Sequence, residues 1–480
     1  MITAFITYLI ILLVAGAIAT QQAKSKDDFL LAGRRLGPLA AGFSAAATSM
    51  SGWLFMGLPG RVLQVGLSGA WVGLGCIVGD YANWKLVSER LRERSAELKA
   101  LTLPEFVTGC RQDPLSKLTR GLAGSGIVFF MTIYLWGQLV ATGKALSGSL
   151  GTQLEYEVAV WVGATVIILY TALGGFVAVV WTDVLQGILI ALALIGLPIY
   201  CVYLVVSQGQ TDLLLVAAPL ERPEGTMGDV WGDAAGLGIA MILISNLGVG
   251  AGYVAQPQMA ARFMALRDAR DAKHARWIGV SWTALTAIGV VVIAMCAPAL
   301  LSEVPGGDAE QVVLATAKQH LPEWLSGVII AALLAAVMSS ADSFLIAAVS
   351  SIQQDFPGRL RTIAKSATVS RVLVIGLGIL ATVLALRGPD SVRALVEYAW
   401  AGLSITFGVT TLYCLYVRTS YTGVVLITMV FGIAMMIAWH ISGLTSKVYE
   451  VIPCLCAQSV VAYTAHSICR SAAESRASWD

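Results

Sequence analysis

The sequence predicts an all-α integral membrane protein with about 13 transmembrane helices. Of its 480 residues, 57% are hydrophobic and only 12% are charged, whereas about 25% of the residues in a soluble domain are charged. Apolar runs of about 20 residues recur along the chain, and each is long enough to cross a hydrocarbon core of about 30 Å. The composition and these runs together favour membrane-spanning helices over a soluble fold.

The distribution of basic residues predicts the orientation. The expected spans cover residues 2–20, 38–62, 66–88, 121–146, 157–181, 184–206, 234–257, 277–301, 325–351, 367–387, 393–417, 421–442 and 448–468. With the N-terminus outside, 24 of the 31 lysines and arginines fall on the cytoplasmic side and 7 on the outer side. Because basic residues concentrate in cytoplasmic loops, this bias predicts an outer N-terminus and a cytoplasmic C-terminus.

The second span, which contains residues 44–60, cannot be a continuous helix. Small and hydroxyl residues fill its first half, and Gly52, Gly57, Pro59 and Gly60 interrupt its second half. In a membrane, broken backbone is tolerated only where it is buried in protein or lines a cavity. A broken span of this kind is typical of the binding site of a secondary transporter.

The seventh span is interrupted in a similar way. Glycines 248, 250 and 252 precede Gln256-Pro257. This span follows the first broken one by five, which is the pattern of two inverted five-helix repeats. The alternative is that these glycines only allow close packing of helices.

The ninth span carries a polar face. Ala336, Ser339, Ser340 and Ser343 lie three or four residues apart, so they share one side of a helix, and Asp342 lies next to them. Hydroxyl, carboxylate and carbonyl oxygens suit a hard cation. The serines could instead bond to their own helix, but a carboxylate within the membrane is costly and usually functional.

Asp183 follows Trp181-Thr182, where we expect the fifth span to join the sixth at the cytoplasmic end. Two interpretations are open for it, a helix cap and a functional carboxylate. The sequence contains no phosphate loop, nucleophile elbow or zinc motif, so it favours a transporter over an enzyme.

The chain resembles the solute:sodium symporter family, and within it the bacterial proline symporters. The resemblance extends in order over nearly the whole chain. It rests on the segments Asp28–Pro38, Met50–Gly60, Asn83–Val87, Leu101–Pro104, Gly174–Phe176, Trp181–Asp183, Gln256-Pro257, Ala261–Met264, Ala335–Ser339, Tyr398–Gly402 and Tyr449–Pro453.

The resemblance implies a leucine-transporter-like fold with two inverted repeats of five helices and alternating access. The division expected is a peripheral N-terminal segment (1–36), the first repeat (37–206), the second repeat (207–417) and two peripheral helices with a short tail (418–480).

The resemblance also implies site residues. A main sodium site would use the backbone carbonyls of Ala47, Met50 and Ala336 and the hydroxyls of Ser339 and Ser340. A second site, for sodium or a proton, would use Asp183, Asp342 and Ser343. Substrate would lie near Ser51, Gly52, Tyr134, Tyr253, Gln256 and Pro257, and Arg34 and Ser49 would take part in coupling.

Three residues depart from the proline symporter pattern. Ser49 replaces an aspartate, Val249 replaces a tryptophan, and Val409 replaces a proline. The expected function is sodium-coupled import of a small amino acid, foremost L-proline, through the bacterial inner membrane. The alternatives are symport of another small amino acid or organic acid with sodium or protons, and a transporter-like membrane sensor. The expected partners are the solute, Na⁺ and lipid, with no nucleic acid and no obligate protein partner.

Overall fold

The computed structural model describes residues 7, 8, 10, 12, 14, 31–147, 154–209, 220, 225–232, 234–302, 307–356, 367–388 and 391–477. Most of the predicted first span, residues 2–20, lies outside this part of the chain. The described residues form helices and connecting turns, and their one isolated β-bridge joins Leu36 to Leu266. The expected all-α architecture is therefore confirmed.

The main helices are α3 (Pro38–Met50), α4 (Gly57–Val65), α5 (Trp71–Asn83), α6 (Glu89–Glu97), α7 (Leu103–Val107), α8 (Pro114–Leu146), α9 (Tyr156–Ser207), α11 (Leu237–Ala251), α12 (Pro257–Ala265), α13 (Asp271–Leu300), α14 (Val312–His320), α15 (Glu323–Gln354), α17 (Ala367–Arg387), α18 (Val392–Tyr416), α19 (Thr422–Ile441) and α20 (Val451–Ala477). Short 3-10 turns are η1 (Ala32–Arg34), η2 (Gly52–Leu54), η3 (Gly66–Ala70), η6 (Ala309–Gln311) and η7 (Leu444–Ser446), and η4 (Trp84–Ser88) is a π-turn.

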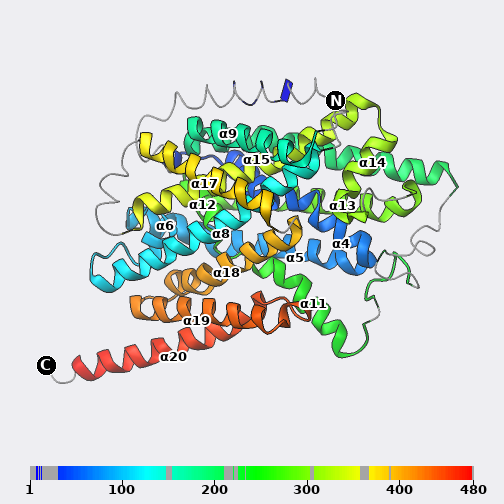
Figure 1. Ribbon diagram of the computed structural model, residues 1–480. Coiled ribbons are helices and arrows are strands. Elements are labelled where there is room, and N and C mark those ends of the chain that lie inside the picture. Colours follow the sequence, from blue (N-terminus) through cyan, green and yellow to red (C-terminus); the bar gives the residue numbers. More distant parts are fainter. Residues whose placement is uncertain are drawn as a thin grey trace.

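The long helices run side by side, with α6 towards one end of the bundle and α14 towards the other (Figure 1). Helix α15 is the centre of this bundle, since its most apolar 18-residue window is wholly buried in protein. Only 22% of the corresponding window is buried in α20 and 33% in α19. These peripheral helices leave apolar surface exposed, as expected where lipid is the solvent.

Both predicted interruptions are confirmed. Helix α3 ends at Met50, and Ser51 then adopts φ +53° and ψ −168°, so the chain turns through η2 before α4 begins. Helix α11 ends at Ala251, and α12 begins at Pro257, which has no amide hydrogen to lose at a helix start. The two breaks leave backbone polar groups inside the bundle, where other elements must satisfy them.

The break between the fifth and sixth spans differs from the prediction. It lies at Gly175, with φ +64° and ψ 178°, and not at Trp181–Asp183. Glycine tolerates this positive φ because it has no Cβ. Asp183 therefore lies two turns inside the sixth helix and is fully buried, so the interpretation of Asp183 as a helix cap is wrong.

The glycines of α11 serve close packing as well as the break. A Cβ on Gly250 would lie 1.9 Å from the carbonyl oxygen of Gly75 in α5, and one on Gly79 would lie 2.0 Å from the carbonyl oxygen of Gly250.

Among the described residues, nine helices are long and apolar enough to span a membrane, and Tyr156–Ala172 and Leu237–Ala251 are shorter apolar helices. The full count of 13 stays a prediction.

Candidate functional site: the break in α3 and the polar face of α15

The end of α3 meets the polar face of α15. Because α3 stops at Met50, the carbonyls of its last turn have no helical amide partners. Ser339 Oγ donates to the carbonyl of Ala47 at 3.2 Å, and Ser340 Oγ donates to that of Thr48 at 3.0 Å. Both hydroxyls also bond to the carbonyl of Ala336, at 3.1 Å each. Five oxygens from two helices thus converge at one buried point.

Four of the five residues expected at a main sodium site are brought together here: Ala47, Ala336, Ser339 and Ser340. The fifth, Met50, is one position before the break, and its sulfur accepts a hydrogen bond from the hydroxyl of Tyr253 at 3.6 Å. Thr48 supplies a carbonyl that the sequence reasoning did not include. All of these oxygens are uncharged and buried, and oxygen ligands of this kind suit Na⁺.

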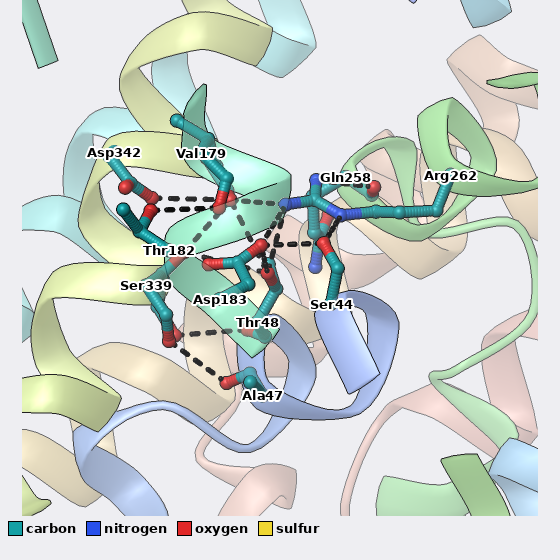
Figure 2. A network of polar contacts seen from close by, with 12 residues as sticks. Ser44, Ala47, Thr48, Val179, Thr182, Asp183, Gln258, Arg262, Ser339 and Asp342 are labelled. Atoms are coloured by element: carbon teal, nitrogen blue, oxygen red, sulfur yellow. Dashed lines mark hydrogen bonds and ion pairs between the residues drawn. The ribbon is translucent and has the colours of Figure 1, made fainter. Parts of the chain in front are cut away.

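A second polar cluster lies one helical turn along α15 and is built around Arg262 of α12 (Figure 2). The guanidinium Nη2 contacts Asp183 Oδ2 at 2.9 Å, Ser343 Oγ at 2.6 Å and Thr48 Oγ1 at 3.0 Å. Its Nε donates to Ser44 Oγ at 2.9 Å, and Ser44 Oγ donates to Asp183 Oδ2 at 2.5 Å. The side chains of Arg262 and Asp183 are 1% and 0% exposed, so this is a fully buried ion pair.

Asp342 lies beside this cluster without a cationic partner among the described residues. Its Oδ1 accepts from Ser343 Oγ at 3.3 Å. Its Oδ2 is buried without a hydrogen-bond partner, and so are Oδ1 of Asp183 and Oε1 of Gln186. The expected second site (Asp183, Asp342 and Ser343) is thus one connected group, in which Arg262 already neutralises one of the two carboxyl groups.

The inner chamber, a small cavity of about 20 Å³, lies on the other side of the break in α3. It is lined by Ser49, Met50, Trp53, Cys76, Tyr134, Val249, Tyr253, Val396, Glu397 and Trp400. The rings of Tyr253 and Trp400 meet edge to face at 4.8 Å. A volume of this size holds about one water molecule, so a solute enters only when these side chains move apart.

Two of the six residues expected to contact substrate, Tyr134 and Tyr253, line the inner chamber, together with Ser49 and Val249. The other four lie outside its wall. Gly52 is packed against Gln138, whose Oε1 accepts its amide at 2.9 Å, and Ser51 accepts the amide of Trp53 at 3.2 Å.

Gln256 and Pro257 support the second broken helix. The Gln256 amide donates to the carbonyls of Gly252 and Trp400, at 2.7 and 3.0 Å. Pro257 lines a different cavity, of about 40 Å³, which also contacts Arg262 and Ser343. Val409 is a partly buried packing residue of α18.

Arg34 lies apart from both polar clusters. Its guanidinium contacts Ser95, the carbonyl of Ala100 at 2.6 Å and that of Met264 at 3.0 Å. It therefore joins η1 to the end of α6 and to α12. In this conformation it touches neither Ser339 nor Asp183.

Two further cavities lie towards the two ends of the bundle. A vestibule of about 500 Å³, lined among others by Arg61, Arg393, Lys447 and Glu450, shares Val249 and Glu397 with the inner chamber. At the other end the cavity beside Arg262 measures only about 40 Å³. The chamber is thus approached from the vestibule end.

Sequence reasoning gave no role to Arg262, Gln138 or Glu397. Arg262 occurs in the segment Ala261–Met264, which is part of the family resemblance. Its position shortly after the second helix break could have indicated a functional cationic residue. Glu397 is a carboxylate within a predicted span, which is itself a signal of function. Gln138 lies one turn after Tyr134 on α8, and its Nε2 is buried without a hydrogen-bond partner.

Comparison with known proteins agrees with this architecture. A profile of the Sodium:solute symporter family matches residues 29–432. The Sodium/proline symporter of Escherichia coli (strain K12) is 35% identical over 465 residues, which cover 94% of this chain and 90% of the relative. The High-affinity proline transporter PutP of Bacillus subtilis (strain 168) is 34% identical over 449 residues, covering 92% of each protein.

Solved structures show the same fold. A Na⁺-coupled sialic acid symporter in a substrate-bound outward-open state has a TM-score of 0.71 at 19% identity, with 96% of this chain and 97% of that chain covered. MhsT in complex with L-phenylalanine has a TM-score of 0.55 at 17% identity, with 92% and 99% covered. Both broken helices and the buried α15 therefore lie in a leucine-transporter-like fold. The chain belongs to the sodium:solute symporter family, and it is a multi-span, sodium-coupled secondary transporter and not an enzyme.

Proposed function

We propose that this protein imports a small amino acid, foremost L-proline, together with Na⁺ by alternating access. The observation that carries the proposal is the meeting of the carbonyls at the end of α3 with the hydroxyls of Ser339 and Ser340. Its relatives named as proline transporters support the choice of solute.

The main sodium ion would bridge α3 and α15. In the structure the two serine hydroxyls point at the same carbonyls that would be ligands of the ion. Sodium would replace these hydrogen bonds and hold the broken helix against α15. A solute that favours the same arrangement is then coupled to the ion, with a coupling free energy of about 1–3 kcal/mol. The membrane potential adds about 2.3 kcal/mol per charge per 100 mV.

Solute would bind in the inner chamber between α3, α5, α8, α11 and α18. Tyr134, Tyr253 and Trp400 supply the apolar surface for a ring such as that of proline. Its carboxylate would lie towards the break in α3, where backbone amides and the buried Nε2 of Gln138 are donors. A proton or a second sodium ion would bind the second site through the carboxyl groups of Asp342 and Asp183.

We further propose that the protein lies in the bacterial inner membrane with its N-terminus outside. The bias of basic residues supports this orientation. The vestibule would then open outwards, and the narrow cavity beside Arg262 would face the cytoplasm. A C-terminal epitope tag should be digested by protease in inside-out vesicles and protected in intact spheroplasts, and the reverse result would contradict this orientation.

The direct test is uptake of labelled L-proline into proteoliposomes with and without an inward sodium gradient. We expect accumulation that requires the gradient. If no amino acid accumulates with sodium, the proposal is wrong. Uptake that follows a pH gradient without sodium would instead select proton coupling through Asp342.

The assigned sodium site has its own test. Ser340→Ala removes one of the oxygen ligands of a buried cation, so the sodium concentration for half-maximal uptake should rise by about 10- to 100-fold. Ser350→Ala, on the same helix but on the wall of the cavity beside Arg262, is the control and should leave this concentration unchanged. Unchanged sodium dependence in both Ser339→Ala and Ser340→Ala would remove the site.

A further inference from the structure

Glu397 lies where the inner chamber meets the vestibule. It lines both cavities, and the other residue that does so is Val249. Every other residue around the chamber is uncharged, and most are aromatic, aliphatic or sulfur-containing. Glu397 is therefore the one charged residue in the wall of the inner chamber. A solute that comes from the vestibule would pass Glu397 as it enters the chamber.

The position of Glu397 is well determined. Trp400 lies four residues after Val396 and three after Glu397, so it shares a face of α18 with each of them, and all three line the chamber. The hydroxyl of Tyr449 donates to the Glu397 carbonyl at 2.7 Å, and Trp400 Nε1 donates to the carbonyl of Val249 at 2.9 Å. These two bonds hold α18 against the segment that precedes α20 and against the second broken helix, so the backbone at Glu397 is fixed beside the chamber mouth.

The charges around Glu397 lie on its vestibule side. Arg61 and Arg393 are the cationic groups that act on it, and Glu450 is an anionic one. All three line the vestibule, and none of them lines the inner chamber. On the chamber side, the wall beside Glu397 contains the aromatic residues Trp53, Tyr253 and Trp400 and no cationic group, and aromatic rings can favour a cation over an anion.

We propose that Glu397 binds the positively charged nitrogen of the solute and makes the chamber selective for zwitterionic amino acids over anions of the same shape. This inference rests on the proposed function, because it places an amino acid in the inner chamber. The solute would lie with its ammonium group at the chamber mouth and its carboxylate towards the break in α3. When the chamber closes, the ammonium group pairs with Glu397 in a water-poor site, where a charge-assisted hydrogen bond is strong.

An anion without the nitrogen would be rejected for a physical reason. It would bring a second negative charge into the chamber and leave the Glu397 carboxylate desolvated on its chamber side without a new partner, and this desolvation costs more than a neutral contact gains. Sites that hydrogen-bond a particular group discriminate strongly against analogues that lack it. The ring itself contributes equally to both solutes, so the nitrogen alone decides the difference.

The test compares L-proline with tetrahydrofuran-2-carboxylate, which keeps the ring and the carboxylate but has an ether oxygen in place of the nitrogen. Competition with labelled proline is measured for the full chain in proteoliposomes under a sodium gradient. The wild type should prefer proline by at least about tenfold. Glu397→Gln should weaken proline by about 10- to 100-fold and, because it removes the charge that rejects the anion, should strengthen the analogue, so that the preference collapses.

Glu450→Gln is the matched control, because Glu450 lines the vestibule but not the chamber, and it should keep the preference. Glu397→Asp retains the charge and should keep part of the preference, which makes the test independent of the folding of a single variant. If Glu397→Gln lowers the uptake rate but keeps the preference for proline, Glu397 is only part of the outer gate and the inference is wrong. If the wild type accumulates no proline, the proposed substrate and this inference both fail.

Discussion

Replacing Arg262 by methionine should destabilise the protein strongly. Methionine fills a similar apolar length but carries no charge, so Asp183 is left buried at 0% exposure without its cation. Three hydroxyl groups, those of Ser44, Thr48 and Ser343, lose a donor at the same time. Four elements (α3, α9, α12 and α15) meet at this side chain, so the loss is felt across the bundle.

The magnitude follows from the burial of the pair. Removing one partner of a buried ion pair costs about 3–5 kcal/mol, because an uncompensated charge remains. Removing both partners is often close to neutral. The double variant Arg262→Met with Asp183→Asn should therefore be more stable than Arg262→Met alone by about 2–4 kcal/mol. The surface pair Arg267–Asp271, in which Arg267 is 65% exposed, is worth less than about 1 kcal/mol.

The measurement is the half-life of the folded, monodisperse protein on heating in detergent, since unfolding of a large membrane protein is commonly irreversible. The four proteins of the cycle and the control Arg267→Met are compared at one temperature. We expect Arg262→Met to be short-lived, the double variant to recover most of the loss, and Arg267→Met to match the wild type. A double variant as short-lived as Arg262→Met would show that packing or the hydroxyl bonds, and not charge, explain the loss, and would refute the reasoning.

Three further predictions concern packing, a loop contact and pH. Gly250→Ala should cost about 1–3 kcal/mol, because its Cβ would meet backbone 1.9 Å away, whereas Gly376→Ala, which has open space around it, should not destabilise in the same heating assay. Glu310→Ala should cost about 1–3 kcal/mol, because its carboxylate accepts two amides at the start of α18, at 2.9 and 3.1 Å. The bonds from the Ser116 hydroxyl and amide hold the pKa of Asp113 below its usual range, so its stabilising effect on α8 should be lost as the pH falls through that lowered pKa, and Asp113→Asn should remove this pH dependence.

The sequence predicted both interruptions and the polar face of α15 because each is a local pattern. Glycine, proline and serine weaken a helix wherever they occur, and residues three or four apart share a face in any helix. The break near the sixth span was misplaced for the same reason. Two glycines at 174 and 175 and the segment Trp181–Asp183 both interrupt an apolar run, and only the positive φ of Gly175 distinguishes them.

What local pattern could not predict is which side chain arrives from another helix. Arg262 is about 80 residues from both Asp183 and Ser343 in the chain, and no periodicity relates them. The inner chamber depends in the same way on five helices. Ser51, Gly52, Gln256 and Pro257, which were expected near the substrate, lie outside its wall in this conformation, and their contact with substrate stays a prediction. Both helix breaks, after α3 and after α11, were located correctly from the sequence. Packing against other helices decides the direction in which the backbone turns at each break.

The arrangement of α15 offers a physical basis for coupling ion binding to the movement of both broken helices. One turn of α15 holds α3 through Ser339 and Ser340, and the next holds α12 through Ser343 and Arg262. Ser343 Oγ donates to the Ser339 carbonyl at 2.8 Å, and Thr48 Oγ1 donates to the same carbonyl at 3.4 Å. A sodium ion that draws the hydroxyls of Ser339 and Ser340 from their present partners therefore acts on a helix turn that also orients the bonds to Arg262. If sodium binds at the proposed site, its occupancy would therefore be linked to the docking of α12 through this buried network, which is the kind of linkage that coupled transport requires.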